Sequence, residues 1–310
     1  MTGIEKLSEE AKIRLTIIIP TKNRVQVLRE LLESIRCLDS VGRVRPEVIV
    51  VDNNSADNTD DVAASIAKNF PTTLRVLKVP RPGKSAAVNE AVNLATGDVL
   101  AFLDDDVVVD KTWLTAIDDF FRESKCQAGQ GVIRLQSPAG NDPEILKLVE
   151  RYRTIPRLEH KKKFETLHSL NGANFFLRRS VFERVGGFDE RLGPGAAGTS
   201  EDVELAHRLT DAKIAIGYAP RAIVYHRVDS DRLTDDYFKQ LHRRQGASRF
   251  LIRRQGTVEI LFNLAHVAFQ YMIYAVFGNE RKRYRSKGRI YHYLGMMAAK
   301  NNSGDLKHRH

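Results

Sequence analysis

The first 135 residues alternate between two hydrophobic spacings. Continuous apolar runs predict buried strands, and segments whose apolar residues recur every three or four positions predict amphipathic helices. Strands that alternate with helices in this way favour an α/β fold, with a mostly parallel, Rossmann-like sheet flanked by helices. The expected strands are LTIIIP, EVIVVD, LRVLKV, VLAFL and AGQGVIRL. The expected helices are VQVLRELLESIRCL, a segment opening near Asp57, SAAVNEAVNLA and TWLTAIDDFF.

The rest of the chain divides into two parts. Residues 136–230 are less regular, and we expect a strand at NGANFFLRR, a short helix at SVFERVGGF and a flexible loop at RLGPGAAGTS. A helix at SEDVELAHRLTDA follows, with Ser200 as its N-cap, and then two short strands at IAIGYAP and AIVYH. Residues 231–310 are expected to be helical. Residues 1–14 are set apart as an N-terminal extension.

Three of the expected strands end in polar clusters. PTKNR follows the first strand, DNNSADN the second and DDD the fourth. In open α/β sheets, ligands bind beyond the carboxyl ends of the strands. The sequence therefore predicts a binding site at this edge of the sheet.

The triplet Asp104, Asp105 and Asp106 is the strongest candidate for chemistry. If the segment stays extended, the side chains of Asp104 and Asp106 lie on the same side, because side chains alternate along a strand. Two carboxylates held together repel each other unless a cation lies between them. Mg²⁺ typically binds one or two protein carboxylates together with substrate phosphates. We therefore expect a metal and a diphosphate here, although such a cluster can also be a solvated turn.

Charge and cysteine content narrow the protein class. The 310-residue chain has a net charge of +10. Residues 239–310 carry 15 Lys and Arg against three acidic residues, a net charge of +12, so the preceding residues sum to −2. Cys37 and Cys126 are too few for a disulfide framework, and the charged N-terminus lacks the apolar core of a secretory signal. These features favour a cytoplasmic protein.

Five motifs together resemble the family 2 glycosyltransferases of the GT-A fold. TIIIPTKNR, VIVVDNNSADNT, GKSAAVNEAVNLATGDVLAFLDDD, NGANFFLRRSVFERVGGFDE and SEDVELAHRL occur in the order found in that family. The resemblance implies a nucleotide-sugar donor, usually UDP-linked, a divalent cation (Mn²⁺ or Mg²⁺), and inversion at the anomeric carbon. It makes residues 15–135 the nucleotide-sugar-binding half and residues 136–230 the acceptor and catalytic half.

The resemblance also implies roles for the polar strand ends. The aspartate triplet matches the family's D-x-D motif, whose last residue, here Asp106, usually meets the metal directly. Asp104 and Asp105 would lie near the ribose and sugar hydroxyls, with Asp104 as a second candidate metal ligand. Asp52 would bind the base, and the neighbouring Asn54 is a further candidate for donor binding.

Two more segments match donor-binding positions of the family. Pro20, Thr21 and Arg24 correspond to the first nucleotide-contacting loop, and Lys84 lies in the stretch that usually approaches the diphosphate or uridine. Val88 departs from the pattern, because many relatives have Arg or another polar residue there. This departure puts the contacts from that helix in question.

Glu201 and Asp202 are the candidate catalytic acids. Sugar transfer needs an acceptor hydroxyl that loses its proton, and a nearby carboxylate is a suitable general base. In the resembled family the second acid of this pair is the base, which points to Asp202. The alternative is that both acids only oppose the helix macrodipole. His226 lies where many relatives place a metal-binding histidine, although a histidine at a strand end is also often structural.

The basic tail contains a long apolar segment at residues 258–277. Its polar residues Glu259, Asn263, His266 and Gln270 are spaced to share one helical face, so we expect an amphipathic helix rather than a membrane span. Basic flanks beside an apolar face suit the surface of an anionic membrane, such as the cytoplasmic face. The alternatives are packing on the catalytic domain or on a second subunit of a homodimer.

Two other functions account for part of the sequence. A sugar-1-phosphate nucleotidyltransferase would need a glycine-rich phosphate loop after the first strand, and PTKNRVQ lacks those glycines. A nucleic-acid-binding protein could use the basic tail, but the aspartate triplet would then have no role. For a glycosyltransferase, the acceptor stays open between a saccharide, a lipid-linked sugar and a small molecule. We expect a role in polysaccharide, cell-envelope glycan or glycolipid synthesis.

Overall fold

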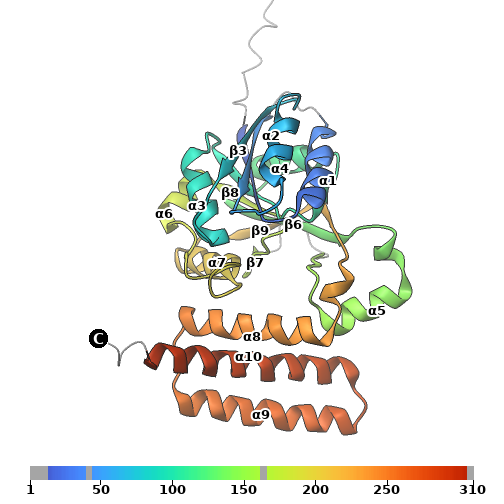
Figure 1. Ribbon diagram of the computed structural model, residues 1–310, viewed down its shortest axis with the longest axis vertical. Coiled ribbons are helices and arrows are strands. Elements are labelled where there is room, and N and C mark those ends of the chain that lie inside the picture. The colour runs from blue at the N-terminus through green and yellow to red at the C-terminus, as the bar shows by residue number, and fades with distance from the viewer. Residues whose placement is uncertain (1–12, 40–43, 161–165, 306–310) are drawn as a thin grey trace, which may run out of the picture.

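The computed structural model describes residues 13–39, 44–160 and 166–305, so the predicted N-terminal extension lies almost wholly outside the described residues. The first half forms the expected alternation of parallel strands and helices (Figure 1). All five strands and four helices predicted there are confirmed. They are β1 (Ile13–Thr21), α1 (Val25–Arg36), β2 (Val44–Asp52), α2 (Thr59–Ala67), β3 (Thr73–Lys78), α3 (Lys84–Leu94), β4 (Val99–Phe102), α4 (Trp113–Glu123) and β6 (Ala128–Leu135).

The second half extends the same sheet. The strand order is β3-β2-β1-β4-β8-β6-β9-β5, with β7 paired to β9, and the pairs made by β8, β5 and β7 are antiparallel. The α/β fold is confirmed, and the sheet is parallel in its first half and mixed beyond β4. The remaining elements of this half are β5 (Val107–Val109), α5 (Pro143–Tyr152), β7 (Thr166–Leu167), β8 (Phe175–Arg178), α6 (Arg179–Val185), α7 (Glu201–Asp211) and β9 (Ile216–His226), with 3₁₀ turns at Ala139–Asn141 and Ser230–Arg232.

The prediction of two short strands before His226 is wrong, because β9 is one continuous strand. Its register with β6 shifts where Gly131 pairs with Ala219 and Val132 pairs with Ile223. The shift leaves Pro220 and its two successors outside the ladder, and a proline cannot donate a ladder hydrogen bond. The irregularity therefore lets the strand pass through a proline that the sequence pattern marks as a break.

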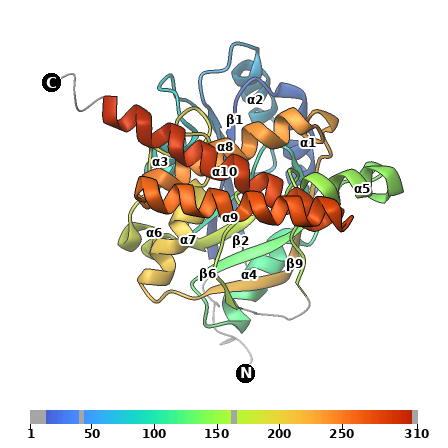
Figure 2. The same ribbon diagram turned by 90° about the horizontal axis from the view of Figure 1, so that it is seen from below.

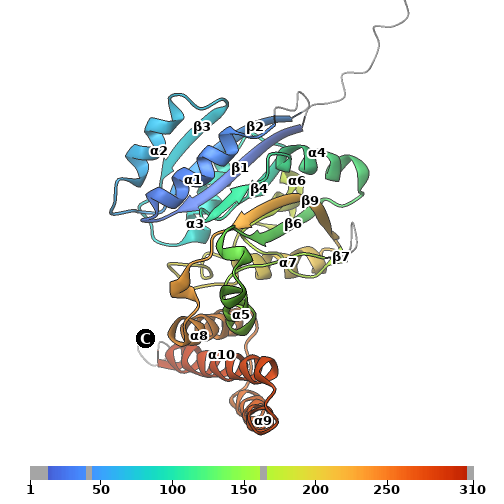
Figure 3. The ribbon, with the colours of Figure 1, turned by 90° about the vertical axis from the view of Figure 1, so that its right-hand side faces the viewer.

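Helices cover both faces of the sheet, which explains the run of consecutive apolar residues at 17–19 in β1. Leu15, Ile17 and Ile19 pack with α1, α2 and α4, whereas Ile18 packs with α3, α6 and α7. Alternate residues of a strand face opposite sides, so a strand covered on both sides needs a continuous apolar run. The two cores hold β1, β2 and β4 rigidly, and the polar clusters that follow them meet at one edge of the sheet (Figure 3).

The tail forms three stacked helices, as its sequence predicts. They are α8 (Asp235–Ile252), α9 (Thr257–Val276) and α10 (Glu280–Asp305). α8 lies next to the sheet domain, α10 lies in the middle and α9 is outermost, and all three run across the molecule (Figures 1 and 2). Phe238 of α8 packs with Tyr152 of α5 and with Tyr284 of α10, and this aromatic cluster fixes the stack beneath the sheet.

Candidate active site

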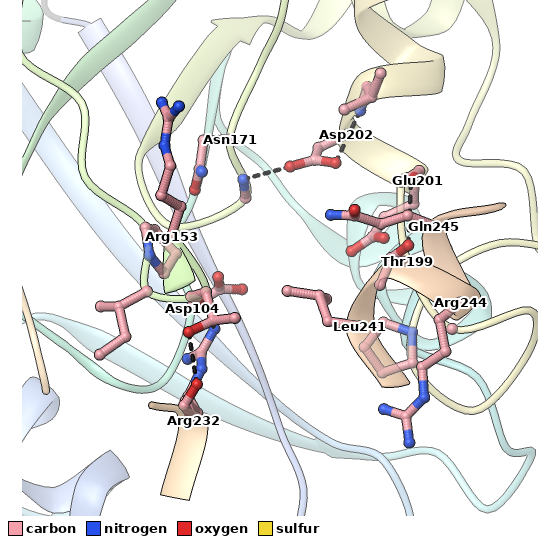
Figure 4. A pocket seen from close by; sticks show the side chains of 18 of the residues that line it. Asp104, Arg153, Asn171, Thr199, Glu201, Asp202, Arg232, Leu241, Arg244 and Gln245 are labelled. Atoms are coloured by element: carbon pink, nitrogen blue, oxygen red, sulfur yellow. Dashed lines mark hydrogen bonds between the residues drawn. The ribbon is translucent and has the colours of Figure 1, made fainter. Parts of the chain in front are cut away.

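A cavity of about 910 Å³ opens between the carboxyl edge of the sheet and α8 (Figure 4). Its volume lies in the range of small-molecule sites. Its lining includes residues from both halves of the sheet domain and from the helical stack. Among the lining residues are Lys84, Asp104, Arg153, Gly172, Glu201, Asp202, Arg232, Tyr237, Leu241, Arg244 and Arg281.

The aspartate triplet turns instead of staying extended, because residues 105 and 106 form a turn after β4. Asp104 is therefore separated from the other two carboxylates, which share the Arg24 guanidinium: Arg24 donates to Asp106 at 3.1 Å as well as to Asp105. An oxygen of Asp104 accepts a hydrogen bond from Lys84 Nζ at 2.7 Å. Asp105 accepts from Thr21 Oγ1 at 2.7 Å and from the Arg24 guanidinium at 2.6 Å.

The surroundings shift the pKa values of Asp104 and Asp105 in opposite directions. Burial favours the neutral form of Asp105 and raises its pKa to about 7, although Arg24 opposes this shift. Burial also disfavours the ionised form of Asp104, but the Lys84 ammonium outweighs it and lowers the pKa of Asp104. Lys84 is buried too, yet Asp104 and Glu201 raise its pKa, so the amine stays protonated. Two oppositely charged groups thus hold each other ionised on the cavity wall.

Asp106 and His226 face each other with both side chains buried. The distance between Asp106 Oδ1 and His226 Nε2 is 3.3 Å, and His226 Nδ1 lies 2.7 Å from the backbone oxygen of Arg227. If Nδ1 donates its hydrogen to that oxygen, Nε2 presents a lone pair to the carboxylate. Two acceptors in this position repel each other unless a proton or a cation joins them.

This pair is therefore suited to a divalent cation, and the donor set fits. Among residues 13–39, 44–160 and 166–305, no group of three or more His, Cys, Asp or Glu side chains is placed to hold a metal ion. A cation at Asp106 and His226 would take its other ligands from outside the protein. This is the usual condition of Mg²⁺ bound between carboxylates and substrate phosphates.

The base-binding candidate Asp52 is fully buried at the end of β2. Its Oδ1 accepts a hydrogen bond from the Ser55 backbone at 3.0 Å, whereas its buried Oδ2 has no partner among the described residues. Asn54 is exposed in a left-handed conformation, with φ of 59°. The structure therefore gives Asp52 a free acceptor atom and turns Asn54 outward. Thr21 pairs with Asp52 in the sheet register, which places the first loop beside this carboxylate.

Pro20 and Val88 border a small apolar space beside Lys84 and Asp202. Val88 is buried and apolar, so this position of α3 offers no polar contact. The next residue, Asn89, accepts from the Phe188 backbone N–H at 2.8 Å and donates to its oxygen at 2.9 Å. This helix thus holds the loop before α7.

Asp202 lies in the first turn of α7 and faces the cavity (Figure 4). Its carboxylate accepts from the backbone N–H groups of Gly172 and Val203, each at 2.8 Å. Burial and the charge of Glu201 raise the pKa of Asp202 to about 7. Glu201 is itself paired with Lys84 at 3.2 Å. Ser200 occupies the predicted N-cap position, but its side chain makes no capping hydrogen bond and its φ is 75°.

Several cavity residues were not singled out from the sequence. Arg232 donates to Asp106 at 3.3 Å and to the Thr154 backbone at 3.0 Å, and no motif marked it. Gly172 belongs to the motif NGANFFLRR, but nothing in that motif showed that its N–H would hold Asp202. Arg153 lies on the same side of the cavity as Arg232, and Arg244 lies on the opposite side (Figure 4).

Comparison with solved structures shows the fold. The mannosyltransferase PcManGT from Pyrobaculum calidifontis, solved in complex with GDP-Man and Mn²⁺, superposes with a TM-score of 0.60 at 19% identity and covers 94% of this chain and 88% of its own. Residues 1–349 of S. aureus TarS in complex with UDP-GlcNAc give a TM-score of 0.57 at 15% identity, covering 94% of this chain and 92% of TarS 1–349. Both support the GT-A architecture.

Comparison of sequences shows the family. Glycosyltransferase AglE of Haloferax volcanii is 26% identical over 211 residues, which are 68% of this chain and 66% of AglE. The pre-mycofactocin glycosyltransferase of Mycobacterium tuberculosis is 31% identical over 228 residues, which are 68% of this chain but only 42% of that protein. The sequence profile described as "Glycosyl transferase family 2" matches residues 16–186, more than half of the chain. The chain therefore belongs to glycosyltransferase family 2.

Proposed function

We propose that this protein is a metal-dependent, inverting glycosyltransferase that moves a sugar from a nucleotide sugar, with UDP-sugars favoured, to a hydroxyl acceptor. The observation that carries this proposal is the placement of Asp202. Its carboxylate has a pKa of about 7 and shares one cavity with Lys84 and Asp104. A poised base beside a phosphate-binding edge is what acceptor activation requires. Synthesis of a polysaccharide, cell-envelope glycan or glycolipid is the corresponding role.

The donor would lie along the carboxyl edge of the sheet. Asp52 offers its unpartnered oxygen to an N–H of the base, and Asp104 offers its second oxygen to the ribose or sugar hydroxyls. Asp106 and His226 would hold the divalent cation, which on binding stabilises negative charge on the diphosphate as a Lewis acid. The nucleotide sugars bound by PcManGT and TarS support a donor of this class.

Asp202 would take the proton of the acceptor hydroxyl. As that oxygen forms its bond to the anomeric carbon, the bond from the carbon to the diphosphate breaks on the opposite side, and the sugar inverts. The proton ends on the Asp202 carboxylate, and the electron pair leaves with the nucleoside diphosphate. Lys84 and Arg232 offset the charge that develops on the leaving group. The acid triplet and the base both have roles here, whereas a nucleic-acid-binding function uses neither.

A thermal-shift panel tests the donor and the metal. The purified chain would be mixed with UDP-, GDP-, dTDP- and CDP-sugars, each with Mn²⁺, Mg²⁺ or excess EDTA. A ligand that binds the folded state raises the melting temperature by mass action, so one nucleotide class with metal should give the largest shift. We expect UDP-sugars with metal to do so and EDTA to remove the shift. Equal shifts in EDTA would contradict the metal assignment.

The variant His226→Ala distinguishes binding of the metal from binding of the nucleotide's base. We expect it to lose the metal-dependent part of the shift, because only Asp106 remains from the pair. His168→Ala is a matched control, since His168 is an exposed histidine that does not line the cavity. A full metal-dependent shift in His226→Ala would show that the cation lies elsewhere.

A further inference from the structure

The outer face of α9 is the main apolar surface of the described chain. Among the described residues, eight large hydrophobic side chains are exposed, and seven of them lie on α9 or at its C-terminal end. Val258 and Val276 are each 81% exposed, Phe277 is 79% exposed and Phe262 is 73% exposed. Leu94 is the one that lies elsewhere. Concentrations of exposed apolar side chains mark interaction sites, whereas scattered ones are ordinary.

These side chains form one continuous stripe. The residues follow helical spacing along the full length of α9. The opposite face carries Ile260 and Val267, which are fully buried, so it is the face that packs against α10. The stripe therefore points away from the rest of the molecule. Its members are Val258, Leu261, Phe262, Phe269, Met272, Val276 and Phe277.

Basic side chains stand at both ends of this stripe. Arg253 and Arg254 are exposed just before α9, and Lys282 and Arg289 are exposed on the part of α10 that meets α9. Lys282 lies 5.4 Å from the Tyr274 ring of α9, and Arg289 donates to Gln270 of α9 at 3.4 Å. The nearby Glu280 is neutralised by Arg151 at 2.8 Å. An apolar stripe with cationic ends matches an anionic lipid surface.

The structure argues against a helix that spans the membrane. Within the described residues, α9 alone has the length and apolar content to cross a bilayer. However, α10 packs along it with Arg285 and Arg289 exposed, and a spanning α9 would draw these charges into the hydrocarbon. His266 and Gln270 also pair at 2.9 Å on the flank of α9.

A second copy of the chain is also a poorer partner for the stripe. In an antiparallel pairing of two α9 helices, the Arg253–Arg254 end of one copy meets the Lys282 end of the other. A parallel pairing brings identical basic ends together. Like charges repel in either arrangement, whereas anionic headgroups attract both ends. We therefore infer that the exposed stripe of α9 docks the enzyme in the plane of an anionic membrane surface, with its apolar side chains in the headgroup boundary.

Sedimentation with lipid vesicles tests this inference on the full chain. We expect the protein to sediment with vesicles made of equal parts phosphatidylcholine and phosphatidylglycerol, and to bind vesicles of phosphatidylcholine alone far more weakly. Added salt should reduce the binding, because it screens the attraction. The double variant Phe262→Ser/Phe269→Ser should bind at least about tenfold more weakly, since it removes two inserted aromatic rings. Leu94→Ser should bind like the unaltered protein.

The control measurements separate the alternatives. A thermal melt and the nucleotide-dependent shift should be unchanged in the Phe262→Ser/Phe269→Ser variant, so a loss of vesicle binding would not reflect misfolding. Absence of binding to anionic vesicles by the unaltered protein would overturn the inference. A dimer that the double variant turns into a monomer, without lipid binding by either, would assign the stripe to a second copy. Retention in membranes washed with alkaline carbonate would indicate a spanning helix.

Discussion

At the scale of single residues, two features of the site raise the free energy of ionised Asp202 and so favour its protonated form. Its carboxylate is buried, and the negative charge of Glu201 lies next to it. Two backbone N–H groups and the nearby Lys84 limit the shift, so the pKa rests at about 7 instead of rising further. A general base works best when its pKa is close to the working pH. The same neighbours that make this carboxylate unusual therefore make it useful.

This pKa predicts the pH dependence of catalysis. The base must be deprotonated, so release of nucleoside diphosphate from the donor should rise about tenfold per pH unit below pH 7 and level off above it. Glu201→Gln removes the neighbouring charge, which should lower the pKa of Asp202 and move the rising limb to lower pH. A rate profile over this range checks both expectations. A limb that does not move in Glu201→Gln would contradict this account of the pKa.

The substitution Asp202→Asn tests the base directly. We expect sugar transfer to fall by about 10²-fold or more, because a general base contributes at least that much. Donor binding, measured by the thermal shift, should stay near normal because Asp202 is not assigned to the donor. Asp211→Asn, at the far end of the same helix, is the control and should transfer at the unaltered rate. An unaltered rate in Asp202→Asn would assign the base to another residue.

At the scale of secondary-structure elements, α8 and α10 are held together by close contact at glycines. A Cβ atom added at Gly246 would overlap the backbone oxygen of His292, and one added at Gly295 would overlap the backbone oxygen of Arg243. Glycine normally weakens a helix interior. Here it lets two helices approach until side chains no longer separate their backbones.

The variant Gly295→Ala should therefore destabilise the protein although alanine favours helix. Overpacking against backbone atoms costs about 1–3 kcal/mol, more than the gain in helix propensity. Gly256→Ala is the matched control, because a Cβ there meets nothing within 4 Å. Thermal melts of both variants check the expectation. A Gly295→Ala protein as stable as the control would show that the helices can separate without loss.

The sequence predicted those elements whose formation is local. β1, β2 and β4 each contain a run of consecutive apolar residues, and each strand was found in place. β5 was not predicted because a run of three valines is too short to indicate a strand. The break predicted within β9 came from Pro220, but a shift in the β6–β9 register leaves this proline outside the ladder and the strand continues. Arg232 could not be predicted as a neighbour of Asp106, because 126 residues separate them in the chain and only the folded sheet brings them together.

The family resemblance indicated roles for single residues that local sequence patterns could not indicate. Asp202 sits in a helix start where acids are ordinary, so only the motif order marked it as a base. The structure adds the reason for its reactivity, namely burial beside Glu201. Asn54 belongs to a polar cluster that points to donor binding, and it is exposed with a left-handed backbone. Its role in donor binding stays a prediction.

At the scale of the whole molecule, the helical stack and the sheet domain both line the cavity that holds Asp202. Tyr237, Leu241 and Arg244 of α8 line one side of it. α8 is in turn covered by α10, since Phe250 packs against Met296 and Phe238 packs against Tyr284. The tail is thus part of the structure that shapes the site.

Deleting the chain after Arg254 should therefore destabilise the catalytic domain. The deletion uncovers Phe238 and Phe250, and exposing a buried phenylalanine costs about 1.5–3 kcal/mol. We expect the melting temperature to fall by roughly 10 °C or more. Point changes on the outer face of α9, such as Phe262→Ser, should leave it unchanged. A truncated protein that melts like the full chain would show that the stack is a separate folding unit.

The order of the three helices also sets the distance between the cavity and the outer face of α9. α10 separates α8 from α9, so the thickness of the helical stack lies between the cavity wall at α8 and the outer face of α9. On a membrane surface docked through α9, the cavity would stand above the headgroups by the thickness of this stack. That clearance is the distance from the bilayer that an acceptor hydroxyl would have to span to reach Asp202.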